Sequence, residues 1–272
     1  MTLPGSDIAI SGDRRLSYPT IDGKRNPLDM PDDTRPLPTG TIVGPDGKQY
    51  ALYSKVPYHL PNGDKNPNYA TKDTTVVDLA NPAKSLGVLP GISQASGAYD
   101  KATNRMVIVG NTGPERGDRT RMLWVSDPID PANPDSWMNT LHPAGVIPGL
   151  PGDRENQLVA LKGGGFMLLG SDNVVPNGNQ QPMTAITAAT PEGLLTAKPT
   201  ALFPPGPQQN WPNGAPPYGP TVVDTTYDPV TGRETVDVRV STWEAPKDWD
   251  PTKVKDMPYN PQTYRTSVTV QH

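Results

Sequence analysis

Two short segments of this chain, 128 residues apart, have almost the same sequence: Tyr99-Asp100-Lys101-Ala102-Thr103-Asn104-Arg105 and Tyr227-Asp228-Pro229-Val230-Thr231-Gly232-Arg233. In each, an Asp opens a turn in which its side chain can bond the backbone two residues later. Asn104 or Gly232 then stands where a left-handed residue closes a hairpin. Such a sequence is also common in isolated β-turns, so coincidence is the alternative. The recurrence favours a chain built from repeated β-units.

Proline and glycine interrupt the chain so often that little room is left for helices. They make up 35 and 26 of the 272 residues, nearly double their usual joint share. In the best uninterrupted stretch, residues 233–245, Val236, Val238 and Val240 alternate with polar residues. That period of two is typical of a half-buried strand. We therefore expect an all-β protein.

The first 39 residues have a composition of their own. Charged pairs such as Arg14-Arg15 alternate there with prolines, and only the segment around Ile8 and Ile10 resembles a strand. We expect residues 1–39 to form an extended N-terminal arm that mediates assembly, with Ile8 and Ile10 adding a strand to an exposed edge. A solvated tail is the alternative.

Residues 40–272 contain four hairpin units at intervals of about 45 to 65 residues, each with one or two further strands. This plan predicts a β-propeller-like domain of four to five blades, and a β-sandwich is the alternative. The fourth unit lacks an outer strand, which residues 7–11 could supply. The predicted strands are 41–43, 49–54, 74–79, 95–100, 106–110, 121–125, one around Trp137, 157–161, 166–170, 183–189, 194–202, 222–227, 235–242 and 266–270.

Charge and composition exclude several classes of function. The formal net charge is −4, so we expect no nucleic acid partner. Cysteine is absent and the three histidines are scattered, so we expect no metal and no cofactor. We predict no membrane-spanning segment. The first residues do not form a signal peptide, and we expect synthesis in the cytoplasm.

One unit resembles a known family. The segments Gly97-Ala98-Tyr99-Asp100, Met106 to Asn111, Leu123-Trp124-Val125-Ser126-Asp127 and Asn133-Pro134-Asp135-Ser136-Trp137 are similar to a blade of the sialidase-like and glycosidase propellers. The resemblance covers about fifty residues. The stricter Asp-box pattern is not met, because residues 128–136 separate Asp127 from Trp137.

The resemblance implies a glycoside hydrolase, which needs two converging carboxylates or an arginine cluster for an anionic sugar. Acidic residues near predicted strand ends are Asp100, Asp127, Glu155, Asp172 and Asp228, and the arginines are Arg105, Arg121 and Arg154. No motif specifies any of them. We therefore expect no catalytic residues and no hydrolysis by Asp127, Glu155 or Asp172, with a sialidase-like hydrolase as the alternative function.

Aromatic side chains on proline-rich segments are the remaining signal. Trp211, Tyr218, Trp249 and Tyr259 are candidate ligand-binding residues, because flat aromatic rings contact sugars and protein partners. Pinning of these segments to the domain is the alternative role for the rings.

The overall composition resembles virion proteins of tailed bacteriophages, such as tail, fibre or head-decorating components. This resemblance implies a non-enzymatic structural or recognition module in a virion. Its partners would be other virion proteins or cell-surface glycans, and it would form a homo-oligomer.

Overall fold

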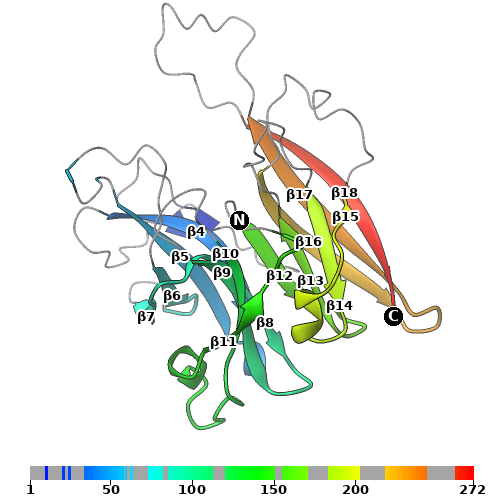
Figure 1. The fold of residues 1–272 in the computed structure, drawn as a ribbon, viewed down its shortest axis with the longest axis horizontal. Helices are drawn as coiled ribbons and strands as arrows, with labels where there is room; N and C mark the ends of the chain where they lie inside the picture. Colours follow the sequence, from blue (N-terminus) through cyan, green and yellow to red (C-terminus); the bar gives the residue numbers. More distant parts are fainter. Residues whose placement is uncertain are drawn as a thin grey trace, which may run out of the picture.

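The computed structural model describes most of the strand regions of the chain (Figure 1). The described residues are 10–11, 20–21, 24–25, 34–57, 59, 62–63, 73–81, 85–112, 120–150, 155–170, 183–202, 218–243 and 261–272. Over these residues the chain is nearly all β, as the turn-rich sequence predicts, and no described helix is long and apolar enough to cross a bilayer.

Four antiparallel sheets follow one another along the chain as the blades of a four-bladed β-propeller. In every blade consecutive strands are neighbours, and the first strand is innermost. Blade 1 contains β4 (Thr34–Val43), β5 (Gln49–Pro57), β6 (Thr74–Asp78) and β7 (Ser85–Leu89). Blade 2 contains β8 (Ser93–Asp100), β9 (Arg105–Thr112), β10 (Thr120–Val125) and β11 (His142–Val146). Blade 3 contains β12 (Asn156–Ala160), β13 (Phe166–Gly170), β14 (Thr184–Ala188) and β15 (Thr200–Ala201). Blade 4 contains β16 (Tyr218–Asp228), β17 (Arg233–Trp243) and β18 (Pro261–Gln271).

Apolar side chains fill the spaces between successive blades. One cluster joins blades 1 and 2 around Trp137 and Leu52, a second joins blades 2 and 3 around Leu158 and Val109, and a third joins blades 3 and 4 around Val238. Blades 2 and 3 therefore bury side chains on both faces, which explains the continuous apolar runs in β9 and β13. This packing confirms the propeller and not the sandwich.

The two similar hairpins occupy equivalent places, as predicted. They join β8 to β9 and β16 to β17, the first and second strands of blades 2 and 4. Asp100 accepts hydrogen bonds from the Ala102 amide at 3.0 Å and the Thr103 hydroxyl at 2.5 Å. Asp228 accepts from the Val230 amide at 2.9 Å and the Thr231 hydroxyl at 2.6 Å. Asn104 and Gly232 have φ angles of 55° and 67°, as the left-handed position requires.

Two predicted outer strands are wrong. Around Trp137 the chain forms the 3₁₀ turn η2 (Ser136–Asn139), and the outer strand of blade 2 is β11 instead. Within 194–202 the chain forms the end of η3 (Glu192–Leu195) and only the two-residue β15. In both cases the turn buries one large side chain, Trp137 or Leu194, and this burial overrides the strand propensity.

The N-terminal region contains three two-residue strands in a small sheet, β1 (Ile10–Ser11), β2 (Thr20–Ile21) and β3 (Lys24–Arg25). Ile10 pairs with Ile21, so β1 does not close blade 4 as residues 7–11 were expected to do. Strand β4 begins at Thr34, and residues 34–39 therefore belong to the inner strand of blade 1. Ile8 lies outside the described residues.

Candidate functional site

The four inner strands, β4, β8, β12 and β16, line the axis of the propeller (Figure 1). Neighbouring inner strands approach each other closely toward one end of this axis. Gly40 of β4 lies so close to β8 that an added Cβ would stand 2.7 Å from the Ala95 carbonyl oxygen. Gln157 of β12 accepts a hydrogen bond from the Val222 amide of β16 at 2.5 Å. We call this end of the axis the entry end.

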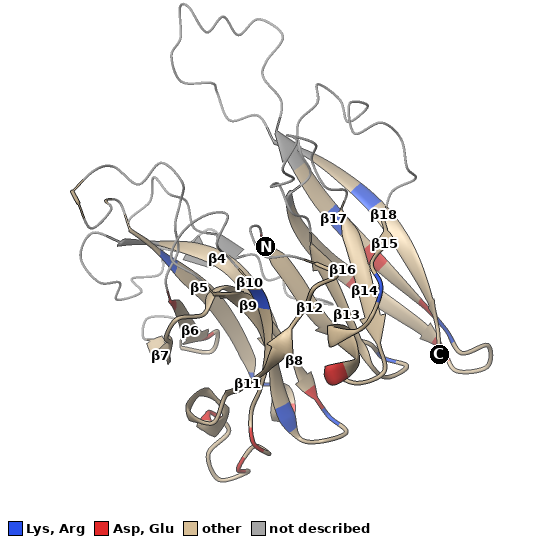
Figure 2. Cartoon of the chain, viewed as in Figure 1, with Lys and Arg blue, Asp and Glu red and all other residues tan. Residues whose placement is uncertain are grey.

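The opposite end carries the short hairpins between first and second strands. Charged side chains gather on the turns at this end, whereas the strands themselves are mostly uncharged (Figure 2). The inner strands also change character along their length. Strands β8 and β12 begin with buried polar residues such as Ser93, Gln94 and Asn156, and buried apolar residues such as Leu158 lie further along. The axis is therefore polar at its entry end and apolar further along.

Hydrogen bonds between side chains of blades 2 and 3 hold the entry end together. The Ser96 hydroxyl donates to Asn156 Oδ1 at 2.5 Å and accepts from the Leu158 amide at 3.0 Å. Asn156 Nδ2 donates to the Gln94 carbonyl oxygen at 2.9 Å. Gln94 has a φ of 49°, an unusual backbone conformation for a residue with a Cβ. This strained position, together with the buried amide of Asn156, is typical of a functional site.

A second chain of hydrogen bonds runs from Arg121 to the same glutamine. Arg121 Nε donates to Asn111 Oδ1 at 3.3 Å, and Asn111 Nδ2 donates to Gln94 Oε1 at 2.6 Å. Since a guanidinium can only donate, the direction of this chain is fixed. It orients the Gln94 amide with its oxygen toward Asn111. A fully buried arginine behind this chain adds positive charge at the entry end.

Glu155 and Gln157 lie side by side at the start of β12. They are two residues apart in an extended segment, so they face the same side, roughly 6.6 Å apart along the strand. Gln157 bonds β16, which places this face toward blade 4. Glu155 Oε2 and Gln157 Nε2 are both buried, and neither has a hydrogen-bond partner among the described residues. Buried polar atoms are nearly always paired in folded proteins, so these two are positions where a polar ligand could bind.

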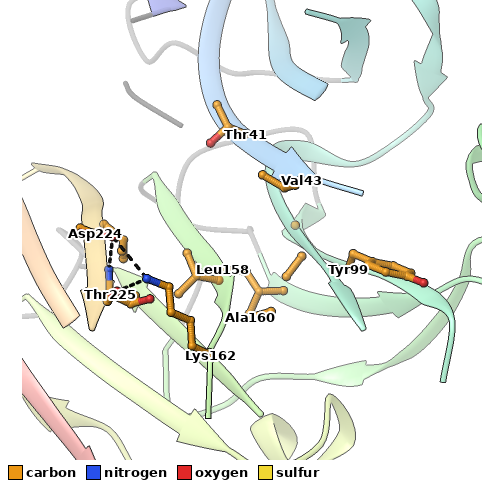
Figure 3. A pocket seen from close by; sticks show the side chains of 12 residues that line it. Thr41, Val43, Tyr99, Leu158, Ala160, Lys162, Asp224 and Thr225 are labelled. Carbon is orange, nitrogen blue, oxygen red and sulfur yellow. Dashed lines mark hydrogen bonds and ion pairs between the residues drawn. The ribbon is translucent and has the colours of Figure 1, made fainter. Parts of the chain in front are cut away.

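A cavity of about 210 Å³ lies next to this cluster along the axis (Figure 3). All four inner strands contribute to its walls, with Val43, Ala98, Leu158 and Val222 among the apolar residues. Its charged pair is Lys162 and Asp224, whose Nζ and Oδ1 atoms are 3.6 Å apart.

The Lys162 ammonium also donates to the Thr225 carbonyl oxygen (Figure 3). Both charged side chains are more than half exposed and already paired, so the cavity offers apolar walls and no pair of free acids. The described residues contain no group of three potential metal ligands.

The predicted catalytic candidates that the structure describes do not converge. Asp100 and Asp228 lie in hairpins at the end opposite Glu155, and Asp127 is exposed after β10. Asp172 lies outside the described residues. The arginine cluster is also separated, because Arg105 pairs with Asp100 in the hairpin whereas Arg121 pairs with Asn111 at the entry end. Arg154 lies outside the described residues.

The predicted aromatic ligand-binding residues stay predictions. Trp211, Trp249 and Tyr259 lie outside the described residues. Tyr218 is the first residue of β16 and pairs with Ser241, and its side chain is not described.

Sequence reasoning missed Gln94, Ser96, Asn156 and Gln157. One signal was available: polar residues occupy the first positions of two strands that otherwise continue as apolar inner strands. Their meeting at one point depends on how blades 2 and 3 pack, which no local pattern encodes.

The chain is similar to solved structures in its fold, but it matches no family model and no curated protein in sequence. Among solved structures, an N-acetylgalactosamine deacetylase from F. plautii, in complex with blood group B trisaccharide, is similar with a TM-score of 0.55 and 11% identity. The match covers 94% of this chain and 83% of the deacetylase. At this identity the match supports the β-propeller fold.

Two further structures show weaker similarity. A mannose phosphorylase from Leishmania mexicana, in complex with phosphate, has a TM-score of 0.48 and 11% identity, with 90% of this chain and 66% of the phosphorylase covered. A GH43_1 enzyme from Xanthomonas citri, in complex with xylose, has a TM-score of 0.43 and 13% identity, with 83% and 72% covered. The chain thus spans about two thirds of the phosphorylase.

These findings correct the functional interpretation of the sequence. The expectations of a non-enzymatic virion module and of no enzymatic activity are contradicted, because the solved structure that shares the fold is an enzyme, the N-acetylgalactosamine deacetylase. The reason for the error is physical. Abundant Pro, Gly, Thr and Asp suggested a virion protein, but tight hairpins and long connections of a propeller demand the same residues.

Proposed function

We propose that this protein is a carbohydrate-active enzyme of the glycoside hydrolase type, with its active site at the entry end of the axis. The observation that carries the proposal is the pair of buried polar atoms without partners, Glu155 Oε2 and Gln157 Nε2. One is an acceptor when ionised and the other a donor. Sugar hydroxyls both donate and accept, so a sugar ring at this position would pair both atoms.

In this proposal Glu155 is the general acid. Its carboxyl group gives a proton to the glycosidic oxygen as the bond from that oxygen to the anomeric carbon breaks. A water molecule then supplies the oxygen of the new anomeric hydroxyl and gives up a proton to a second carboxylate acting as the base. The Gln157 amide donates to a hydroxyl of the same sugar and positions it. Asn156 and Gln94 are held by Ser96 and Asn111 and keep the polar wall in place.

Hydrolysis needs a second carboxylate, about 5 to 10 Å from the first. Glu155 is the acidic residue that the described segments place at the beginnings of the inner strands. Asp172 is our candidate for the second. It follows Gly170, the last residue of β13, by two positions, and Gly170 pairs with Asn156 next to Glu155. Its own position lies outside the described residues.

Oligosaccharides are the first substrates to test. The deacetylase that shares the fold was solved with a blood group trisaccharide, and uncharged amides and hydroxyls dominate the entry end here. Neutral sugars with several hydroxyls fit this chemistry better than anionic ones. Arg121, the one buried arginine among the described residues, bonds Asn111, which in turn bonds Gln94.

The test is turnover by the full chain on a panel of nitrophenyl glycosides and neutral oligosaccharides. Replacing Glu155 by Gln keeps the shape of the side chain and removes the acid. We expect kcat to fall by about 10²- to 10⁴-fold while KM changes little. Glu192→Gln is the matched control, because Glu192 is exposed in η3 and should leave kcat unchanged.

Two outcomes would contradict the proposal. The first is a Glu155→Gln variant with the kcat of the unaltered protein on a substrate that the protein hydrolyses. The second is an absence of turnover across the panel together with no binding of any of its sugars in calorimetry. Asp172→Asn tests the second carboxylate in the same assay and should also lower kcat.

A further inference from the structure

The outer edge of blade 4 differs from those of the other blades. Blades 1 to 3 end in the short strands β7, β11 and β15, of five, five and two residues. Blade 4 ends in β18, which has eleven residues and pairs with β17 on one side. No described strand pairs with its other side, and β18 forms the margin of the sheet (Figure 1).

Strand β18 also lacks the features that usually prevent a free edge from pairing. Its register with β17 continues over all eleven residues without a bulge. Its proline, Pro261, is the first residue, where it does not interrupt the edge. Arg265 is its one charged residue, and that guanidinium already lies 3.9 Å from Asp237 of the same sheet. A long, regular and nearly uncharged edge is a template for another strand.

The backbone groups that face outward can be identified. The His272 amide donates to the Gly232 carbonyl oxygen at 2.9 Å, which sets the alternation of the antiparallel ladder. The even-numbered residues of β18 then bond β17. The odd-numbered residues point their N–H and C=O groups away from it, and these are Thr263, Arg265, Ser267, Thr269 and Gln271.

The edge is complementary to itself. When two copies of β18 pair antiparallel about Thr266, the outward-bonding residues meet one another, as the ladder requires. On the exposed face Thr263 stands opposite Thr269, and no two charges meet. On the other face Tyr264 stands opposite Val268, and both already pack partly against the core of blades 3 and 4. Thr–Thr and aromatic–β-branched pairs are favourable cross-strand pairs.

We propose that two copies of this chain pair through β18 into a symmetric dimer. The two blades 4 then form one continuous six-stranded sheet, with the two-fold axis at Thr266. Every contact occurs twice, as in any two-fold interface. A contact of one strand is small for a protein interface, so the dimer dissociates on dilution. This inference is independent of the enzymatic proposal.

The test is sedimentation velocity of the full chain from about 1 to 100 µM, a range that covers dissociation constants of weak and moderate dimers. The unaltered protein should shift from monomer to dimer across this range. In the variant Thr263→Lys/Thr269→Lys, two Lys–Lys pairs face each other, and the dimer should weaken about tenfold. The variant Thr263→Glu/Thr269→Glu should behave alike, and an equimolar mixture of the two variants should recover the dimer.

The control Thr226→Lys/Val230→Lys carries the same added charge on exposed positions of β16 and its hairpin. It should dimerise like the unaltered protein. Circular dichroism shows whether each variant keeps its fold, and recovery in the mixture excludes misfolding as the cause.

The proposal is wrong if the unaltered protein stays monomeric at every concentration, or if the lysine variant dimerises as before. It is equally wrong if Ile8→Lys/Ile10→Lys abolishes the dimer while the β18 variants retain it. In that case the N-terminal segment is the interface.

Discussion

Replacing Glu234 by Ala should weaken the joint between blades 3 and 4 and lower the free energy of unfolding by about 2–4 kcal/mol. The Glu234 side chain has no exposed surface. Its carboxylate accepts hydrogen bonds from the Lys162 amide at 2.9 Å, the Gly163 amide at 2.8 Å and His272 Nε2 at 3.0 Å. The residue therefore links the hairpin after β12 to β17 and to the residue after β18.

The magnitude follows from two opposing contributions. Three hydrogen bonds to a charged acceptor are worth about 1.5–3 kcal/mol each, or roughly 4.5–9 kcal/mol together. Removing the carboxylate also removes its burial cost of several kcal/mol, and the amides of the hairpin can turn to water. Glu234→Gln keeps one acceptor oxygen and the volume, so its cost should be smaller, about 1–2 kcal/mol.

Urea unfolding followed by tryptophan fluorescence measures these differences. Glu192→Ala is the control, because an exposed substitution outside such a network changes stability by about 0.5 kcal/mol or less. If Glu234→Ala unfolds within about 0.5 kcal/mol of the unaltered protein, the carboxylate does not hold the blades together and the reasoning fails.

Two further predictions concern titration. Burial raises the pKa of Tyr53, and burial with a hydrogen bond to Asp135 raises the pKa of Tyr50, so the folded state holds these protons more tightly than the unfolded chain. The free energy of unfolding should then decrease as the pH rises above 10.0, the ordinary pKa of tyrosine. The variant Tyr50→Phe/Tyr53→Phe should show a smaller decrease when urea unfolding is measured between about pH 9 and 11. The Thr231 hydroxyl and then the Val230 amide lower the pKa of Asp228 below 3.8, so the stability it contributes is present above that pH and is lost as the pH falls through the folded-state value. Thr231→Val should move the pKa of Asp228 back toward 3.8 in an NMR titration, and an unchanged value would show that the hydroxyl is not the cause.

The hairpins could be predicted from neighbouring residues in the sequence, whereas the outer strands could not. The Asp100 and Asp228 turns depend on residues within five positions, so their chemistry is readable without a structure. Strand β7 was missed because Gly87 interrupts its apolar pattern, and this glycine faces Met138 of η2 from the neighbouring blade. The error at Trp137 has a similar origin. Its ring lies 5.7 Å from that of Tyr50 in blade 1, a contact that only the packed blades create.

The candidate site is the least local feature of the chain. Glu155 was named from its place near a strand end, but its neighbours were not predictable. Gln94 reaches Asn156 across 62 positions, and Gln157 reaches Val222 across 65. No sequence motif indicates that residues so far apart in the chain are in contact. What the sequence does encode is the polarity of the first residues of β8 and β12, and that pattern becomes informative once the strands are known to be innermost.

The hairpin end of the propeller is a suitable place to attach a label or a surface. Val230 projects from the turn between β16 and β17 with 91% of its surface exposed, and its hairpin is closed by the hydrogen bonds of Asp228. A fluorophore or surface-attachment group fixed at this turn would stand at the far end of the axis from Glu155. Immobilised in this way, the molecules would share one orientation, with the entry end turned toward the solution.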